Sequence, residues 1–116
     1  LGHLLEMLQN QTSDPVRVHL NPEAIPALPG ALTLLEQGLA STLAPANARA
    51  LSALETGGSV QIDGVLSAAR RGLLIDPQTC GPLLAALPAE RAQAALQALH
   101  AQGFLDAAVI GAVMTG

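Results

Sequence analysis

The spacing of apolar side chains predicts a helix at the start of the chain and a strand shortly after it. Leucines recur at helical intervals over residues 1 to about 10, so that helix has one apolar face. Turn-forming residues fill positions 10–15. Valine and leucine then alternate with arginine and histidine over 16–20, which indicates a strand with one buried face.

Prolines and glycines divide the middle of the chain into short elements. Three prolines within 21–29 predict irregular structure, and the leucines of 31–39 predict a second helix. Residues 40–47 are expected to form a loop, followed by a short helix over 48–54. The glycine pair at 57–58 is expected to end that helix.

The pattern that follows is less regular. Residues 60–72 fit more than one element, and we favour a short helix near 65–71. The apolar runs at 73–75 and 83–87 predict two short strands, the first of them buried. A turn or loop over 76–82 is expected to join these two strands.

The clearest predicted element is a helix that begins at Pro88. Glu90 in its first turn and His100 in its last turn complement the helix dipole, and Gly103 ends it. Its buried face is expected to carry Ala92, Ala95, Leu96 and Leu99. Residues 107–114 are apolar apart from one glycine, which predicts a final strand that is central and covered on both faces.

These elements mix strands and helices without strict alternation. That order predicts a single α+β domain over residues 1–116, with a small mixed sheet and packed helices. Leu1 is not methionine, and the chain opens inside a helical pattern without a capping residue. We therefore expect the chain to be part of a longer polypeptide.

Composition and charge argue against several classes of function. The formal net charge is −4 and all five basic residues are arginines, so a basic stripe for nucleic acid or for an anionic membrane surface is missing. Without lysine, a nucleotide would have to find its usual phosphate-binding cation elsewhere. No apolar run approaches the ~20 residues of a membrane-spanning helix. Phe104 is the one aromatic residue, and the single Cys80 fits a reducing compartment.

The three histidines offer no local metal site. His3, His19 and His100 lack a partner at the spacing of a metal-binding pair, and His3 with Glu6 makes only two ligands. His100 is interpreted as a favourable charge at a helix C-terminus, and His19 as the exposed side of a strand. The role of His3 stays open. We assign neither a catalytic residue nor a metal ligand to this chain.

The loop over 76–82 is the most unusual stretch, because it gathers polar residues between two apolar runs. It could present backbone N–H groups and the hydroxyl of Thr79 to an anion. It could instead be a structural connection in which Asp76 and Thr79 satisfy backbone donors, and composition favours this second interpretation. Cys80 is interpreted as a small residue in a tight turn rather than a nucleophile.

Three segments resemble conserved stretches of the selenide, water dikinases (selenophosphate synthetases). Residues 1–7 are similar to the end of the family's Gly-Phe-Gly-Leu-Leu-Gly-His-Leu-Leu-Glu-Met stretch. Residues 25–31 are similar to its Leu-Pro-x-Leu-Pro-Gly-Ala segment, and 74–84 to its Asp-Pro-Gln-Thr-Ser-Gly-Gly-Leu-Leu signature. The segments occur in the family's order, and 88–91 and 108–111 add further support.

The resemblance implies the C-terminal domain of the aminoimidazole-ribonucleotide (AIR) synthase type, an α+β fold that is partly ferredoxin-like. It implies a cytoplasmic transferase, a kinase that makes selenophosphate from selenide and ATP, with AMP and phosphate as the other products. In such enzymes an N-terminal ATP-binding domain, absent from this chain, holds the catalytic Cys or selenocysteine, its lysine and most Mg²⁺ ligands. The same domain forms the homodimer. ATP and Mg²⁺ therefore belong to the parent enzyme, and no cofactor is expected in this chain alone.

By the same resemblance, this domain closes over the nucleotide held by its N-terminal partner domain. His3, Asp76, Thr79 and Gly81 are expected to face the cleft between the domains, near the phosphates. Two positions depart from the family pattern, since Cys80 replaces Ser or Ala and Pro82 replaces the second Gly. Pro82 lacks a backbone N–H and fixes φ, so an anion contact made by that Gly would be lost.

Two other functions stay open on the sequence. One is the corresponding domain of a related enzyme: AIR synthetase, thiamine-phosphate kinase or the hydrogenase-maturation dehydratase. The other is a non-catalytic interaction module, for which Pro82 is the one motivation.

Overall fold

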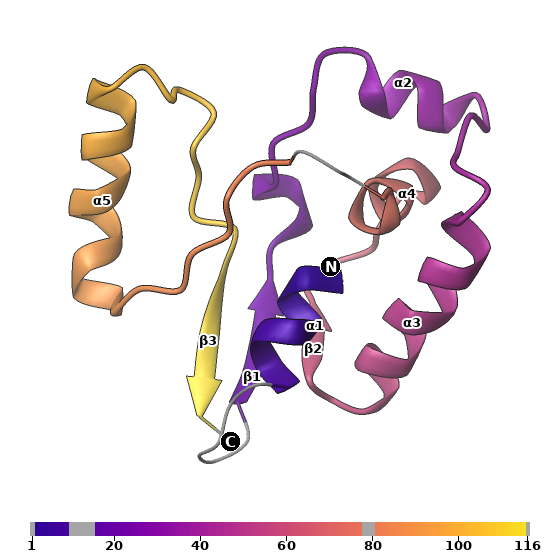
Figure 1. Cartoon of the computed structure of the whole chain (residues 1–116), viewed down its shortest axis with the longest axis horizontal. Coiled ribbons are helices and arrows are strands. Elements are labelled where there is room, and N and C mark those ends of the chain that lie inside the picture. The colour runs from indigo at the N-terminus through magenta and orange to yellow at the C-terminus, as the bar shows by residue number, and fades with distance from the viewer. Residues whose placement is uncertain (1, 10–15, 78–80, 116) are drawn as a thin grey trace.

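A three-stranded sheet and a set of short helices form the described part of the chain. The computed structural model describes residues 2–9, 16–77 and 81–115. Their elements, in chain order, are α1 (Gly2–Gln9), β1 (Val16–Leu20), the 3₁₀ turn η1 (Pro22–Ala24), α2 (Ala31–Glu36), α3 (Ala44–Thr56), β2 (Val60–Ile62), α4 (Ala68–Ile75), α5 (Ala89–Ala101) and β3 (Gly111–Thr115). This mixture confirms the predicted α+β class (Figure 1). None of the helices in these described ranges is long and apolar enough to cross a membrane.

The sheet is mixed, with strand order β2-β1-β3. The central strand β1 runs parallel to β2, with Val18 opposite Val60, and antiparallel to β3, with Leu20 opposite Gly111. The prediction of a final strand is therefore confirmed, but its predicted central position is wrong, because β3 lies at the edge of the described sheet. Val113 in β3 is 53% exposed. An apolar run alone does not distinguish a central strand from an edge strand, since only the neighbours decide its burial.

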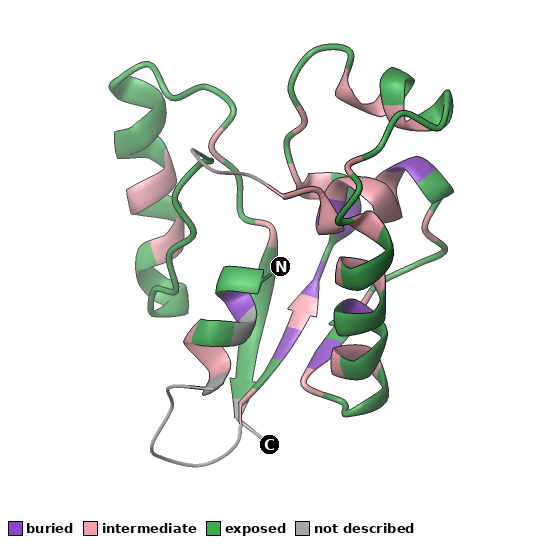
Figure 2. Ribbon diagram, turned by 45° about the vertical axis from the view of Figure 1, so that its right-hand side comes forward, coloured by how far each residue is buried: buried purple, intermediate pink, exposed green. Residues whose placement is uncertain are grey.

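One face of the sheet and α1 form the main hydrophobic core. Leu4 of α1 packs with Val18, Leu20 and Val60 of the sheet, and all four are buried (Figure 2). Leu54 of α3 packs at the border of this cluster. Burying each such side chain contributes about 1.5–3 kcal/mol, so this contact fixes α1 on the sheet.

A second packed group lies beside the sheet, where α2 and α3 both contact α4 (Figure 1). Leu51 of α3 is its best-covered side chain, at 1% exposure, and Ala69 and Leu74 of α4 are also buried. α4 begins where the Ser67 hydroxyl accepts a hydrogen bond from the Arg70 amide at 3.1 Å, as expected of a helix cap. The predicted strand at 73–75 is wrong, because these residues form the last turn of α4.

The helix after Pro88 is confirmed as α5, but its predicted buried face is only half covered, since Ala92, Ala95 and Leu96 are half-buried and Leu99 is exposed. All thirteen residues of α5 are described and none is buried. Leu99 is 44% exposed. Both ribbon views show α5 standing apart from the other helices, joined to the sheet through β3 (Figures 1 and 2). The spacing therefore predicted the more covered side of α5 correctly, although no residue on that side is fully buried.

Several predicted boundaries shift in the structure. The second helix ends at Glu36, and α3 begins at Ala44 in the expected loop, with Pro45 in its first turn, where proline is tolerated. α3 ends before the predicted glycine turn, where Gly58 has a φ of 72°. The ambiguous stretch 60–72 contains β2 and the start of α4. The predicted strand at 83–87 is wrong, since these residues form neither helix nor strand and are exposed.

Candidate functional site

The polar loop over 76–82 follows directly on α4, so its position depends on how α4 is held. Asp76 is the residue that caps the C-terminus of α4, and it is half-buried and already engaged in an interaction. Gly81 is exposed. Thr79 and Cys80 lie outside the described residues.

Asn47 of α3 holds the end of α4 at the point where the loop begins. Its side-chain Nδ2 donates a hydrogen bond to the carbonyl oxygen of Ile75 at 2.7 Å. The last carbonyls of a helix have no partner within the helix, so a side chain from a neighbouring helix is needed when they are shielded from water. This bond fixes the backbone one residue before Asp76.

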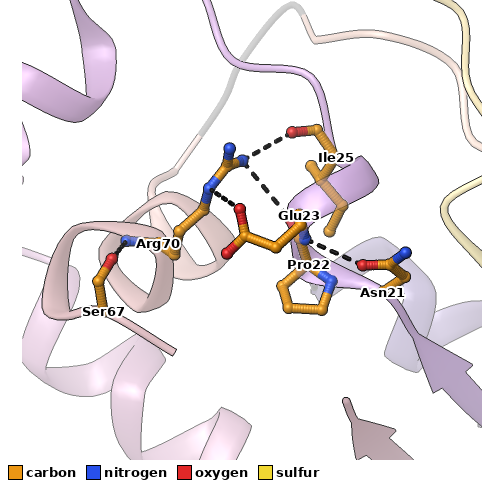
Figure 3. A network of polar contacts seen from close by, with 6 residues as sticks. All are labelled: Asn21, Pro22, Glu23, Ile25, Ser67 and Arg70. Atoms are coloured by element: carbon orange, nitrogen blue, oxygen red, sulfur yellow. Dashed lines mark hydrogen bonds and ion pairs between the residues drawn. The ribbon is translucent and has the colours of Figure 1, made fainter. Parts of the chain in front are cut away.

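Arg70 ties α4 to the segment after β1 (Figure 3). Its Nη1 donates to the carbonyl oxygens of Ile25 at 2.9 Å and of Pro22 at 3.3 Å. Its Nε lies 3.5 Å from the Glu23 carboxylate, which is largely exposed and so contributes little. The side chain of Arg70 is only 18% exposed, and a charged donor to two carbonyls is among the stronger hydrogen-bonding arrangements.

The same network orders η1 itself. The Asn21 side-chain oxygen accepts a hydrogen bond from the Glu23 amide at 3.2 Å and thereby caps η1 (Figure 3). Ile25, the second carbonyl partner of Arg70, begins the segment 25–31 that resembles the selenide, water dikinases. Arg70 therefore connects this segment to the helix in which the third family-like stretch, 74–84, begins.

A third contact holds α4 against α3. The Arg71 guanidinium donates to both carboxylate oxygens of Glu55, and both side chains are partly buried. The Arg71–Glu55 pair and Asn47 hold α4 against α3, and Arg70 holds it against η1. The loop that starts at Asp76 thus leaves a helix that is held by hydrogen bonds to α3 and to η1.

The structure places the predicted site residues on two different elements. His3 lies on α1, is 87% exposed, and its Nδ1 lies 3.1 Å from the Glu6 carboxylate. Asp76 and Gly81 belong to the segment after α4. Whether these three residues face a nucleotide stays a prediction. In the described residues, no group of three or more His, Cys, Asp and Glu side chains is placed to hold a metal ion.

The other two histidines have local partners. His100 lies in the last turn of α5, as predicted, and its Nε2 is 2.8 Å from the carbonyl oxygen of Ala107. It thereby connects the helix to the segment that leads into β3. His19 is partly exposed on β1, and its Nδ1 lies 4.0 Å from the Asp63 carboxylate.

Sequence reasoning missed Arg70 and Asn47, two of the residues that hold α4. Their partners are backbone carbonyls 45 and 28 residues away, which no local pattern predicts. One feature of the sequence could have indicated Arg70. The chain has only five basic residues, and two of them are adjacent at Arg70 and Arg71. In a chain with so few cations, such a pair on a partly apolar helix indicates a specific partner for each.

Comparison with known proteins shows similarity along the entire chain. It is 37% identical over 116 residues to the selenide, water dikinase of Myxococcus xanthus (strain DK1622), with 100% of this chain and 30% of the relative covered. Identity is 32% to that of Pseudomonas straminea and 34% to that of Burkholderia orbicola (strain MC0-3), with the same coverage. No family model matches the chain, and no solved structure matches it.

The matches confirm the resemblance that the three sequence segments indicated. They extend it from those segments to the full 116 residues. The chain spans about 30% of the length of the curated relatives it matches.

Proposed function

We propose that this chain is the C-terminal domain of a selenide, water dikinase, and that it closes over a nucleotide site formed by the rest of that enzyme. The observation that carries the proposal is the full-length match to relatives of which the chain spans about 30%. A segment of 116 residues has the size of one domain of a longer enzyme. The reaction we assign to the parent, by family resemblance, converts selenide and ATP to selenophosphate, AMP and phosphate.

The residue content of the chain supports a division of labour between two domains. The sequence has no lysine and carries a net charge of −4, so its long-range field does not attract a polyphosphate. We therefore assign ATP and Mg²⁺ to the N-terminal domain of the parent. In this proposal the present domain covers the nucleotide and excludes water, and the cations that bind the phosphates belong to the N-terminal domain.

The anchoring of α4 supports a positioning role for the loop over 76–82. A loop that covers phosphates must keep its backbone N–H groups in place, and such positions are most precise when they leave a rigid element. Asn47, Arg70 and Arg71 hold α4 through long-range hydrogen bonds. Closure of this domain would exclude water and protect a phosphorylated intermediate from hydrolysis.

We propose that four residues face the cleft near the phosphates: His3, Asp76, Thr79 and Gly81. Pro82 follows them and has no backbone N–H to donate. Changing Pro82 to Gly in the parent enzyme should therefore strengthen any phosphate contact made by this loop. The kinetic test is the KM for ATP, which should fall in the Pro82→Gly enzyme.

The exposed apolar side chains around α5 support a contact with the parent's N-terminal domain. Leu87, Leu99, Phe104 and Leu105 are all at least 44% exposed and lie on α5 or the segments beside it. Apolar surface of this kind commonly marks an interaction site. We propose that the N-terminal domain of the cytoplasmic parent, which by family resemblance is a homodimer, covers this surface.

Isothermal titration calorimetry tests the proposed role. The 116-residue chain should give no measurable heat of binding with ATP and Mg²⁺ in the micromolar range, whereas the full-length parent should. Tight, Mg²⁺-dependent ATP binding by the chain alone would refute the division of labour, because the nucleotide site would then lie within these residues.

A further inference from the structure

A shallow hollow of about 340 Å³ lies on the sheet, away from the residues assigned above. Arg17 and His19 of β1, Gln61 of β2 and Met114 of β3 line it. In a strand, residues two apart point to the same face, so Arg17 and His19 share the face opposite to buried Val18. The hollow therefore lies on the sheet face that α1 does not cover.

The strand register brings three hydrogen-bonding side chains together. His19 and Gln61 are direct neighbours across β1 and β2, and Arg17 pairs with Met114 across β1 and β3. Residues two apart in a strand are separated by about 6.6 Å, and neighbouring strands by about 4.8 Å. The backbone positions of Arg17, His19 and Gln61 thus lie within the span of one small ligand, and Met114 adds an apolar residue to the lining.

The charge that remains unneutralised in this hollow is that of Arg17. Glu55 also lines the hollow, but its carboxylate accepts hydrogen bonds from Arg71. The Nδ1 of His19 is 4.0 Å from the Asp63 carboxylate, which is too long for a hydrogen bond but within ion-pair distance when the ring is protonated. Within the described part of the chain, Arg17 takes part in none of the ion pairs and side-chain hydrogen bonds.

We propose that this hollow binds a tetrahedral oxyanion, namely a phosphate group. The Arg17 guanidinium offers a rigid fork of N–H donors that matches phosphate oxygens. Gln61 adds an amide donor and His19 a ring N–H, so three donor groups face one ligand. A tetrahedral anion presents more acceptor oxygens to such a set than a planar carboxylate does. This site is additional to the proposed function and uses none of the four residues proposed to face the cleft.

Nuclear magnetic resonance titration of the 116-residue chain with inorganic phosphate tests this site. At constant ionic strength, backbone amides of β1 and β2 should shift saturably, with a dissociation constant in the low millimolar range. Arg17→Gln should weaken the binding about tenfold, because a charged hydrogen bond is lost. Arg49→Gln is the matched control, since Arg49 is also exposed but lies on α3, and it should leave the binding unchanged.

Two further measurements secure the interpretation. His19→Gln and Gln61→Ala should each weaken phosphate binding a fewfold, and dispersed amide spectra will establish that the variants are folded. Acetate at the same ionic strength should bind more weakly than phosphate. Equal losses in the Arg17 and Arg49 variants, an unsaturable shift, or acetate binding as tight as phosphate binding would each overturn the proposal.

A titration with ATP in the absence of Mg²⁺ distinguishes the source of the phosphate group. Shifts of the same amides that depend on Arg17 identify a nucleotide phosphate as an occupant, and shifts with inorganic phosphate alone identify the free ion. Both results support the site. This weak, Mg²⁺-independent binding is separable from the tight binding that would refute the proposed function, because only the former should respond to Arg17→Gln.

Discussion

Replacing Gly111 by alanine should detach β3 from the centre of the sheet. Gly111 is the first residue of β3 and lies opposite Leu20 of β1. A Cβ atom built on Gly111 would overlap the carbonyl oxygen of His19 and would lie only 3.2 Å from Leu20 Cα. These are backbone atoms of the central strand, so they cannot rotate away as the end of a flexible side chain could.

The cost of the substitution follows from this overlap. The φ of Gly111 is not positive, so alanine would suffer from the overlap and not from an unfavourable backbone conformation. Overpacking of this kind typically costs about 1–3 kcal/mol, which corresponds to a fall in Tm of roughly 5–15 °C for a domain of this size. The adjacent hydrogen bond from the Asn21 amide to the Ile110 carbonyl, at 2.8 Å, should break as β3 moves.

Two measurements check this prediction. Thermal unfolding followed by circular dichroism gives the change in Tm, and amide hydrogen exchange at Asn21 reports the local separation of β3 from β1. Gly2→Ala is the matched control, because a Cβ there meets nothing within 4 Å, so Tm should stay constant or rise slightly. An unchanged Tm together with full protection of the Asn21 amide in Gly111→Ala would refute the β1–β3 register described above.

Three further substitutions, with Glu23→Gln as a control, test the packing around α4, each by chemical denaturation. Arg70→Gln should cost about 1.5–3 kcal/mol, because the charged donor to the Ile25 carbonyl is lost, whereas Glu23→Gln should cost at most about 1 kcal/mol. Asn47→Ala should cost about 1–3 kcal/mol, because it leaves a shielded helix carbonyl without its donor; equal stability would show that water replaces the amide. Leu51→Ala should cost about 2–5 kcal/mol, since its side chain is 1% exposed, and a loss below about 1 kcal/mol would contradict this packing.

The elements that sequence predicted correctly are those with complete local signals. Residues 16–20 alternate strictly and form β1, and the helix after Pro88 has both a start signal and the stop signal Gly103. The apolar runs at 73–75 and 83–87 were assigned wrongly, because three to five apolar residues fit a helix, a strand or an exposed segment equally well. What decided these cases was capping by Ser67 and the presence or absence of a packing partner.

Some residues of the candidate site could be predicted from the sequence and others could not. Asp76 and Gly81 could be named from the sequence, because they belong to a motif that is contiguous along the chain. Arg70 could not, because its partner Ile25 is distant in sequence and offers only a backbone carbonyl. The hollow beside Arg17 was also missed, since it depends on the register of three strands. A site formed by neighbouring residues in the chain can be predicted from the sequence, whereas a site formed by residues of several strands can be found only once the fold is known.

We have proposed that this chain is one part of a two-part enzyme. The direct measurement is selenide-dependent formation of AMP from ATP by a chimera, in which this chain replaces the matching 30% of the Myxococcus xanthus selenide, water dikinase. We expect the chimera to retain activity, whereas the same enzyme without that segment should have none. A folded chimera that is no more active than the truncated enzyme would contradict the account.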